Sequence, residues 1–327
     1  MWFERMTGFK ETSPETVRRH LAVEGSWLES LANGRRWHMG CLSIPSLQEL
    51  RERNDRKRVN GPGRLAVSET VADVQALHCD PANAGTLFQV ASQFNLLEMV
   101  GPEVTPEMGI DRYESDPTQG PACAIACGAG TIFRNYFVPV GGGVGQSAER
   151  QIDCLADLGN ALGNEEERLW QMQNGYCLAT AEGLEEIARI LLNADEEAYE
   201  SLKGKIRVGL QQETEVTLQE AGHRVTQAYC SALPVGYSRH PSALWEPFAR
   251  LVLEAAYEAT LLAALENFQK RGNPVVYLTL LGGGAFGNDA VWILDALQKA
   301  LKHFEAMPLD VRIVSHCLPN PLLRMIL

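Results

Sequence analysis

The feature that most constrains the fold is an apolar segment, residues 275–281, that runs directly into three consecutive glycines. Continuous apolar runs of this length are typical of strands covered on both faces, as in the centre of a parallel sheet. After the glycine-rich loop at 282–288, Asp289 stands where a helix N-cap is expected, and the helix is predicted to reach His303. The region therefore predicts a strand, a glycine loop and a helix in succession, which is a building unit of α/β proteins.

Segments on either side extend this alternation of strands and helices. One long helix is expected over residues 244–271, immediately before the central strand. Further strands are expected at residues 71–78, 86–91, 206–217, 225–232 and 311–315. This order predicts a layered α/β fold.

Two regions differ from this pattern and read as additions to the main domain. Residues 1–65 are rich in charge, with a helix start at Ser13-Pro14-Glu15 and a basic run that leads into a turn at 60–63. We interpret them as an N-terminal helical extension. Residues 66–327 form the main domain, and a helical insertion is expected at about 147–204.

Charge and composition exclude several classes of function. The 327 residues include 29 Lys and Arg against 41 Asp and Glu, a formal net charge of -12. Binding to nucleic acid or to an anionic membrane needs a basic surface, so neither partner is expected. No apolar run reaches the length of a membrane helix, and residues 1–10 lack a signal-peptide pattern, which favours a soluble, cytoplasmic protein.

The eight cysteines are spread along the chain, and only Cys123 and Cys127 stand at a spacing that suggests part of a metal site. No second Cys or His pair follows at a matching distance, so free thiols in a reducing compartment are the better interpretation. The histidines likewise lack neighbours at ligand spacing. No metal and no other cofactor are predicted.

The glycine loop has a chemical interpretation and a structural one. Glycines let backbone N–H groups approach a phosphate closely, and the following helix N-terminus favours an anion. The loop is no P-loop, because it lacks the Gly-Lys-Ser/Thr signature, and a dinucleotide fingerprint fits only loosely through Gly282, Gly284 and Gly287. A tight strand-to-helix turn without a ligand is the alternative.

Several motifs stand in an order that points to one family. Cys79-Asp80 precedes the segment 86–95, Ser231 begins a segment that ends at Pro234-Val235-Gly236-Tyr237, and the long helix, central strand and glycine loop follow. In this order the chain resembles the macrodomain family, including its poly(ADP-ribose) glycohydrolase-like branch, over about residues 70–145 and 205–317. The resemblance implies a three-layer α/β/α sandwich around a mixed sheet, with ADP-ribose as ligand.

The resemblance also implies roles for individual residues. Asp80 would accept the adenine amino group, the glycine loop would wrap the diphosphate, and Phe286 would pack near the distal ribose. The residues expected to contact ADP-ribose are Asp80, Gln93, Asn95, Thr118, Gln119, Ser231, Tyr237, Gly282, Gly283, Gly284, Ala285, Phe286, Gly287 and Asn288.

The chain departs from the family where catalysis is expected. The ribose loop retains one clear asparagine, Asn95, and Leu96-Leu97-Glu98 replaces the glycine run that usually follows. The three glycines followed by Gln-Glu-Glu of the glycohydrolase branch are missing, and the triple glycine at 282–284 lies near the other end of the chain. The catalytic groups must therefore be sought in the segment that differs.

That segment is acidic. Its carboxylates are Glu98, Glu103, Glu107, Asp111, Glu114 and Asp116. Cleavage of a glycosidic bond passes through an oxocarbenium-like state that carboxylates can stabilise, so we predict Asp116 as the catalytic residue, with Glu107 and Glu98 as partners. A solvated acidic loop is the alternative, and Asp116 or Thr118 is also placed to cap the next helix.

Two further side chains have two interpretations each. Arg134 can hold a diphosphate or form a structural salt bridge, and Tyr176 can stack on adenine or pack in the core. The sequence favours an ADP-ribosyl hydrolase that acts on an ADP-ribosylated protein. A module that binds ADP-ribose, or a related NAD-derived nucleotide, without cleaving it is the alternative.

Overall fold

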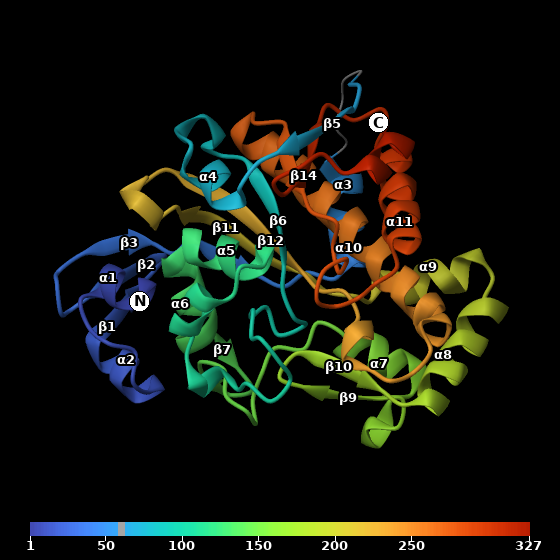
Figure 1. Cartoon of the computed structure of the whole chain (residues 1–327), viewed down its shortest axis with the longest axis horizontal. Coiled ribbons are helices and arrows are strands. Elements are labelled where there is room, and N and C mark those ends of the chain that lie inside the picture. Colours follow the sequence, from blue (N-terminus) through green and yellow to red (C-terminus); the bar gives the residue numbers. More distant parts are fainter. Residues whose placement is uncertain (58–62) are drawn as a thin grey trace.

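A seven-stranded mixed sheet organises the computed structural model, which describes residues 1–57 and 63–327. Four neighbouring strand pairs, from β12 to β5, are parallel, and the two pairs at the other end are antiparallel. In spatial order the strands are β4 (Cys41–Ser43), β11 (Gly209–Glu215), β12 (Arg224–Cys230), β6 (Leu87–Ala91), β13 (Val275–Leu278), β14 (Asp310–Ser315) and β5 (Ala66–Val71). This arrangement confirms the predicted α/β fold with a mixed sheet (Figure 1).

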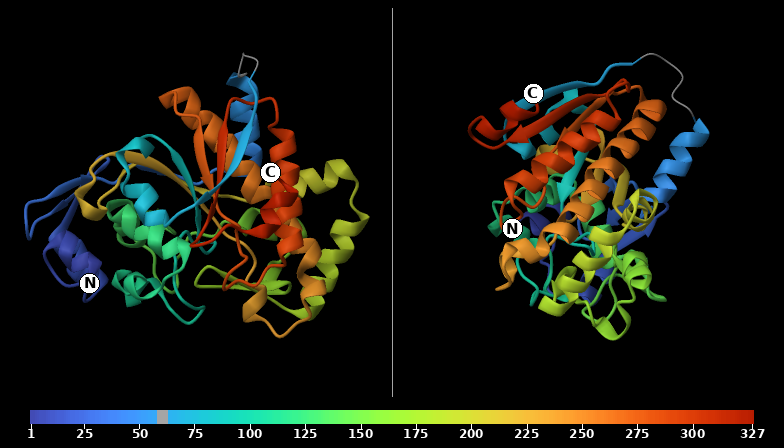
Figure 2. Two further views of the ribbon diagram at one scale, coloured as in Figure 1. Left: turned by 45° about the horizontal axis from the view of Figure 1, so that its top comes forward. Right: turned by 90° about the vertical axis from the view of Figure 1, so that its right-hand side faces the viewer.

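Helices cover both faces of the sheet, as alternating residues of β6 show. Gln89 faces α10 (Ser242–Arg271), where its Nε2 donates to Thr260 Oγ1 at 3.0 Å. Phe88 points to the opposite face and stacks on His78 of α4 (Val74–Cys79), with ring centres 3.8 Å apart. Side chains along a strand alternate between faces, so the sheet lies between two helical layers (Figure 2).

The layer that contains α10 also holds α11 (Ala290–His303), and the other layer holds α5 (Gln119–Ala126) and α6 (Gly128–Tyr136). The Asp289 side chain accepts the Val291 N–H at 2.8 Å, which confirms the predicted N-cap of α11. The predicted long helix is α10.

Most predicted strands are present in the sheet, with one exception. The strand predicted at 71–78 is wrong: β5 ends at Val71, and the helix α4 begins at Val74. Asp73 explains the change, because its side chain caps this helix by accepting the Ala76 N–H at 2.9 Å. The predicted central strand also ends earlier, at Leu278, and the last residues before the glycines already belong to the loop.

The N-terminal region contains helices, as predicted, and also a small β-sheet. Its helices are α1 (Trp2–Thr7), α2 (Pro14–His20), where Ser13 is the N-cap, and α3 (Leu47–Lys57). A separate three-stranded sheet of β1 (Leu21–Glu24), β2 (Trp27–Ser30) and β3 (Arg36–His38) was not predicted, and β4 joins the central sheet. The turn predicted at 60–63 lies, apart from Gly63, outside the described residues.

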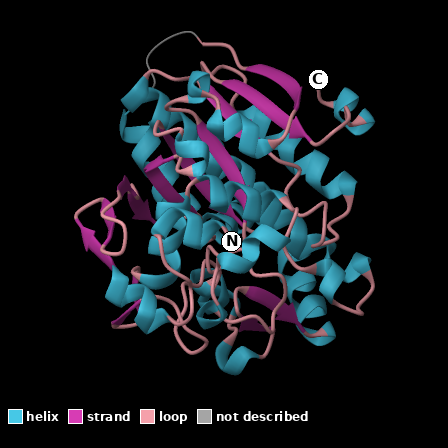
Figure 3. Ribbon diagram, turned by 60° about the vertical axis from the view of Figure 1, so that its left-hand side comes forward, coloured by secondary structure: helices cyan, strands magenta, loops and turns pink. Residues whose placement is uncertain are grey.

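The insertion likewise combines helices with a hairpin. It contains α7 (Ala156–Leu162), α8 (Ala181–Asn193) and α9 (Glu196–Gly204), together with β9 (Trp170–Gln173) paired to β10 (Tyr176–Ala179). A short ladder of β7 (Pro139–Val140) and β8 (Gly143–Val144) precedes it. Figure 1 shows α8 and α9 on the side of the molecule opposite the N-terminal elements, and Figure 3 shows the strands enclosed by helices.

Two apolar clusters fix these parts in place. The larger one surrounds the central sheet and includes the insertion. The smaller one joins the N-terminal helices to α5 and α6, and it includes Leu97, Met99, Ile110 and Tyr113. The apolar residues of the acidic segment that follows β6 therefore pack against the N-terminal region. This packing holds the backbone of the segment that carries the carboxylates.

Candidate nucleotide and glycosidic-bond site

A cavity of about 420 Å³ opens where β6, β12 and β13 end. Its size falls in the range of small-molecule sites, and carboxyl ends of parallel strands are where α/β proteins bind ligands. The cavity is lined by Ala91, Ser92, Gln93, Glu98, Met99, Val100, Ser115, Asp116, Pro117, Thr118, Gln119, Gly120, Pro121, Tyr176, Ala232, Tyr237, Thr279, Leu280, Leu281, Gly282, Gly284, Ala285 and Phe286.

The glycine loop needs glycine at its first position. Gly282 has a φ of +78°, in the left-handed region, and a Cβ there would lie 2.5 Å from the Cβ of Ala232. Asn288 closes the loop, since its Nδ2 donates to Leu233 O at 2.8 Å and its N–H donates to Gly282 O at 3.0 Å. The loop is therefore a rigid element built on the end of β13.

Three successive N–H groups of this loop remain free to bind a ligand. Those of Gly283 and Gly287 donate to Leu280 O and Gly284 O. Within the described chain, the N–H groups of Gly284, Ala285 and Phe286 have no acceptor, and these three residues line the cavity. Successive free N–H groups in a turn can form an anion-binding concavity, so this part of the cavity has donors of the kind that suit a phosphate.

Three aromatic rings lie together at the cavity. Tyr176 and Phe286 have ring centres 5.4 Å apart, and Tyr237 lies 5.1 Å from Tyr176 and 5.7 Å from Phe286. Tyr176 is anchored by its hydroxyl, which donates to Met99 O at 2.6 Å. Tyr176 is buried, as its interpretation as a core residue requires, and it also lines the cavity; stacking on adenine stays a prediction.

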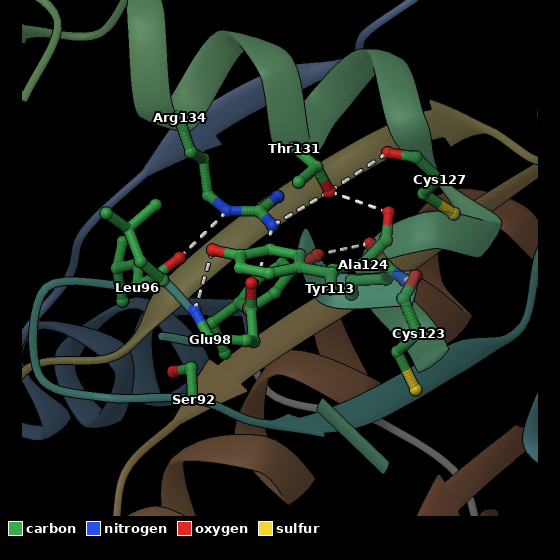
Figure 4. A network of polar contacts seen from close by, with 12 residues as sticks. Ser92, Leu96, Glu98, Tyr113, Cys123, Ala124, Cys127, Thr131 and Arg134 are labelled. Carbon is green, nitrogen blue, oxygen red and sulfur yellow. Dashed lines mark hydrogen bonds and ion pairs between the residues drawn. The ribbon is translucent and has the colours of Figure 1, made fainter. Parts of the chain in front are cut away.

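Glu98 is the buried acid of the cavity (Figure 4). Its side chain is almost inaccessible to solvent, and neither carboxylate oxygen has a hydrogen-bond partner. Burial raises the pKa of Glu98 to about 8, although the nearby Arg134 guanidinium acts in the opposite direction. At neutral pH this carboxyl group is therefore mainly protonated, as a proton donor must be.

Arg134 lies behind Glu98, with Nη2 3.8 Å from the Glu98 Oε1. The guanidinium is fully buried, donates to Leu96 O and Thr131 Oγ1 at 3.1 Å each, and lies 3.7 Å from the ring centre of Tyr229. Figure 4 shows this network between α6 and the segment after β6. Because Arg134 does not line the cavity, its structural interpretation is the one that the geometry supports.

The backbone around Glu98 is held from several directions. The Glu98 N–H donates to the hydroxyl oxygen of Tyr113 at 2.9 Å, and the Leu97 N–H donates to Asn95 Oδ1 at 3.0 Å. Leu96 adopts a φ of +64°, a conformation that residues other than glycine seldom take. Such a conformation persists only where the surroundings enforce it, so the position of Glu98 is strongly determined.

Asp116 also lines the cavity, but one of its oxygens is already engaged. Its Oδ1 accepts the Thr118 N–H at 2.9 Å and the Thr118 hydroxyl at 2.6 Å, in the turn that leads into α5. Gln119 fixes this helix to the sheet, because its side chain accepts the Ala91 N–H and donates to Gln89 O. Neither Asp116 nor Thr118 caps α5 with its side chain, because the Asp116 contacts close the turn before the helix; Asp116 lies at the cavity, and its catalytic role stays a prediction.

Two predicted residues lie away from the cavity. The Glu107 carboxylate is on the surface and accepts the Ala148 N–H at 2.9 and 3.0 Å. Asp80 is exposed and accepts the Ala82 N–H at the start of a 3₁₀ turn. That turn precedes β6, at the strand end opposite the cavity, so the structure brings neither side chain to Glu98.

The remaining predicted residues fall into two groups. Those that support the walls without lining them are Asn95, Ser231, Gly283, Gly287 and Asn288. Those that line the cavity beside Glu98 and Asp116 are Gln93, Thr118, Gln119, Tyr237, Gly282, Gly284, Ala285 and Phe286. The sequence analysis missed Met99, Val100, Pro121 and the residues 279–281, although those at 279–281 could have been found as the end of the central strand.

Residues 1–57 and 63–327 lack two kinds of feature. No cluster of three or more His, Cys, Asp or Glu side chains has the arrangement of a metal site in this part of the chain. Among the helices of these residues, none combines the length and the apolar character that crossing a membrane requires.

No protein-family model matches the sequence, and no curated protein is significantly similar to it. Solved structures do match it. Poly(ADP-ribose) glycohydrolase from Deinococcus radiodurans in complex with ADP-ribose is 12% identical, with 86% of this chain and 88% of that chain covered and a TM-score of 0.44. The enzyme of the same name from Thermomonospora curvata is also 12% identical, with 94% and 91% covered and a TM-score of 0.42. These two poly(ADP-ribose) glycohydrolases are among the solved structures to which the chain is similar.

Proposed function

We propose that this chain binds ADP-ribose in the cavity and hydrolyses the glycosidic bond that joins ADP-ribose to a modified protein. The observation that carries the proposal is the presence, in one cavity, of a buried glutamic acid whose carboxyl oxygens have no hydrogen-bond partner, together with three free backbone N–H groups. The N–H groups of residues 284–286 suit a diphosphate, and the acid suits a bond that breaks with proton transfer. The order of the sequence motifs supports the same ligand.

Glu98 takes the role of general acid in this proposal. As the bond between the anomeric carbon and the leaving atom breaks, the leaving group keeps the electron pair and accepts the Glu98 proton. Asp116 faces the positive charge that develops on the ribose. A water molecule then forms the new bond to the anomeric carbon, and the proton it loses returns to the Glu98 carboxylate.

The experiment is the release of free ADP-ribose from an ADP-ribosylated protein, followed by chromatography. We expect Glu98→Gln to lower turnover about 10²–10⁴-fold, the usual loss when a general acid is removed, while ADP-ribose still binds. Glu107→Gln is the matched control, because the same change is made in the same segment but outside the cavity. Equal turnover by the two variants would contradict the proposal.

One observation favours binding without cleavage. Glycoside hydrolysis generally uses two carboxyl groups, and Asp116 already accepts two hydrogen bonds at Oδ1 from Thr118. A binding module needs only the N–H groups and the aromatic rings. Calorimetric binding of ADP-ribose by a parent protein that releases none from any modified substrate would support this second function.

A further inference from the structure

We propose that the cavity selects phosphodiesters over terminal phosphates, so that a diphosphate esterified at both ends binds better than the same diphosphate with a free end. The inference rests on the proposed function, since it takes the diphosphate to lie at the free N–H groups of residues 284–286. It concerns which nucleotides the site admits.

The charges at the cavity carry the inference. Among the described residues that line it, none is Lys, Arg or His, and the two ionisable carboxyl groups are those of Glu98 and Asp116. The guanidinium beside Glu98, that of Arg134, is fully buried and does not line the cavity. An anion in this site is therefore held by neutral hydrogen-bond donors, the free N–H groups among them, with no cation in the lining and with at least one carboxylate in the same cavity.

Such a site treats singly and doubly charged phosphates differently. Each phosphate of an internal diphosphate carries one negative charge, whereas a terminal phosphate loses a second proton with a pKa of about 6. Partial charges on three N–H groups suit a phosphate with a single negative charge. The second charge of a terminal phosphate is repelled by Asp116. Because the walls around Tyr176 and Phe286 are apolar, water screens this repulsion less than it would at an open surface.

The test uses two ligands that differ only in this charge: ADP and ADP methylated on its terminal phosphate. Both displace ADP-ribose from the full-length protein in a calorimetric competition at about pH 7 and about pH 5, either side of the phosphate pKa. We expect the methyl ester to bind at least about tenfold more tightly than ADP at the higher pH. The preference should shrink at the lower pH, where ADP gains a proton.

A pair of variants locates the source of the preference. Asp116→Asn keeps an acceptor for Thr118 but removes the charge, so it should narrow the gap between the two ligands at about pH 7. Glu107→Gln removes a charge outside the cavity and should leave the gap unchanged.

The outcomes separate this inference from the proposed function. ADP that binds as tightly as its methyl ester at the higher pH overturns the inference and leaves the ADP-ribose site standing. Failure of both ligands to displace bound ADP-ribose overturns it too, because the ester is expected to bind. Absence of ADP-ribose binding to the folded protein overturns the inference together with the proposed function.

Discussion

Two buried glutamates of this molecule have opposite surroundings. Glu258, on α10, accepts hydrogen bonds from Arg51 at 2.6 and 2.8 Å and forms an ion pair with Lys203 at 3.1 Å. Glu98, at the cavity, has no hydrogen-bond partner, and its nearest cation is 3.8 Å away. Burial acts to raise the pKa of both groups, yet the pKa of Glu258 is lowered and that of Glu98 is raised to about 8.

The difference indicates that ion pairs and hydrogen bonds, rather than burial alone, decide whether a buried glutamate is ionised or protonated. Glu258 stays ionised because two cations surround it, and the pairs connect α10 to α3 and α9. Burial raises the pKa of Glu98 because the single guanidinium nearby, that of Arg134 at 3.8 Å, does not offset it and no donor reaches the carboxylate oxygens.

The largest effect on stability is expected from removing the ion pairs of Glu258 with Arg51 and Lys203. Glu258→Gln leaves Arg51 and Lys203 with one negative partner fewer, in a place that water barely reaches. Removing one partner of a buried pair destabilises by about 3–5 kcal/mol, and because Glu200 remains near both cations we expect about 2–3 kcal/mol. Urea unfolding measures this loss of free energy of unfolding. The same substitution at Glu98, whose carboxylate oxygens have no hydrogen-bond partner, should not lower the free energy of unfolding in this way.

The second effect is a dependence of stability on pH that belongs to Glu98. Its pKa is about 8 in the folded protein and near 4.5 when unfolded, so raising the pH through 8 favours unfolding. Glu98→Gln removes this penalty. The variant should gain at least about 1.4 kcal/mol relative to the parent between about pH 6 and about pH 9, since one pKa unit corresponds to about 1.4 kcal/mol.

The gain should be visible in urea midpoints measured across that pH range. A constant difference between Glu98→Gln and the parent at every pH would mean that Glu98 ionises normally in the folded protein, and the contrast with Glu258 would disappear.

A smaller change is expected at the cation beside Glu98. Arg134→Met removes the charge that favours the ionised form, so the pKa of Glu98 should rise further, by about one unit. Titration of the Glu98 carboxyl group in this variant provides the measurement. Thr131→Val, which removes only one hydrogen bond of Arg134, is the control and should shift the pKa much less.

The smallest effect is expected on the surface. Glu107→Gln keeps an oxygen that can accept the Ala148 N–H, and the group is exposed. The free energy of unfolding should change by less than about 0.5 kcal/mol. A larger loss would show that the acidic segment depends on this surface contact as well as on its buried apolar residues.

Local sequence signals gave much of the fold. The capping residues Ser13 and Asp289, the long helix and the apolar central strand act over a few positions, so their structure follows from neighbouring residues. The strands β1 to β4 contain only three or four residues each. β1 to β3 pair with one another as neighbours in the sequence but are too short to give a clear pattern, and β4 pairs with the distant β11, which a local pattern cannot predict.

The candidate site was predictable to a similar degree. The glycine loop and Glu98 were named from the sequence, but nothing local separates Glu98 from Glu107 in the same acidic segment. Their difference comes from Tyr113 and Arg134, which enclose one and not the other. The residue that the sequence favoured, Asp116, lies at the cavity with one oxygen occupied by Thr118.

The most direct test of the central claim is an infrared titration of Glu98 itself. A protonated carboxylic acid has a carbonyl band that a carboxylate lacks, and the band that Glu98→Gln removes belongs to this residue. The account predicts that the band is present in the parent protein at neutral pH and disappears with a midpoint near pH 8. A band that disappears near pH 4.5, the ordinary value for a glutamate, would contradict it.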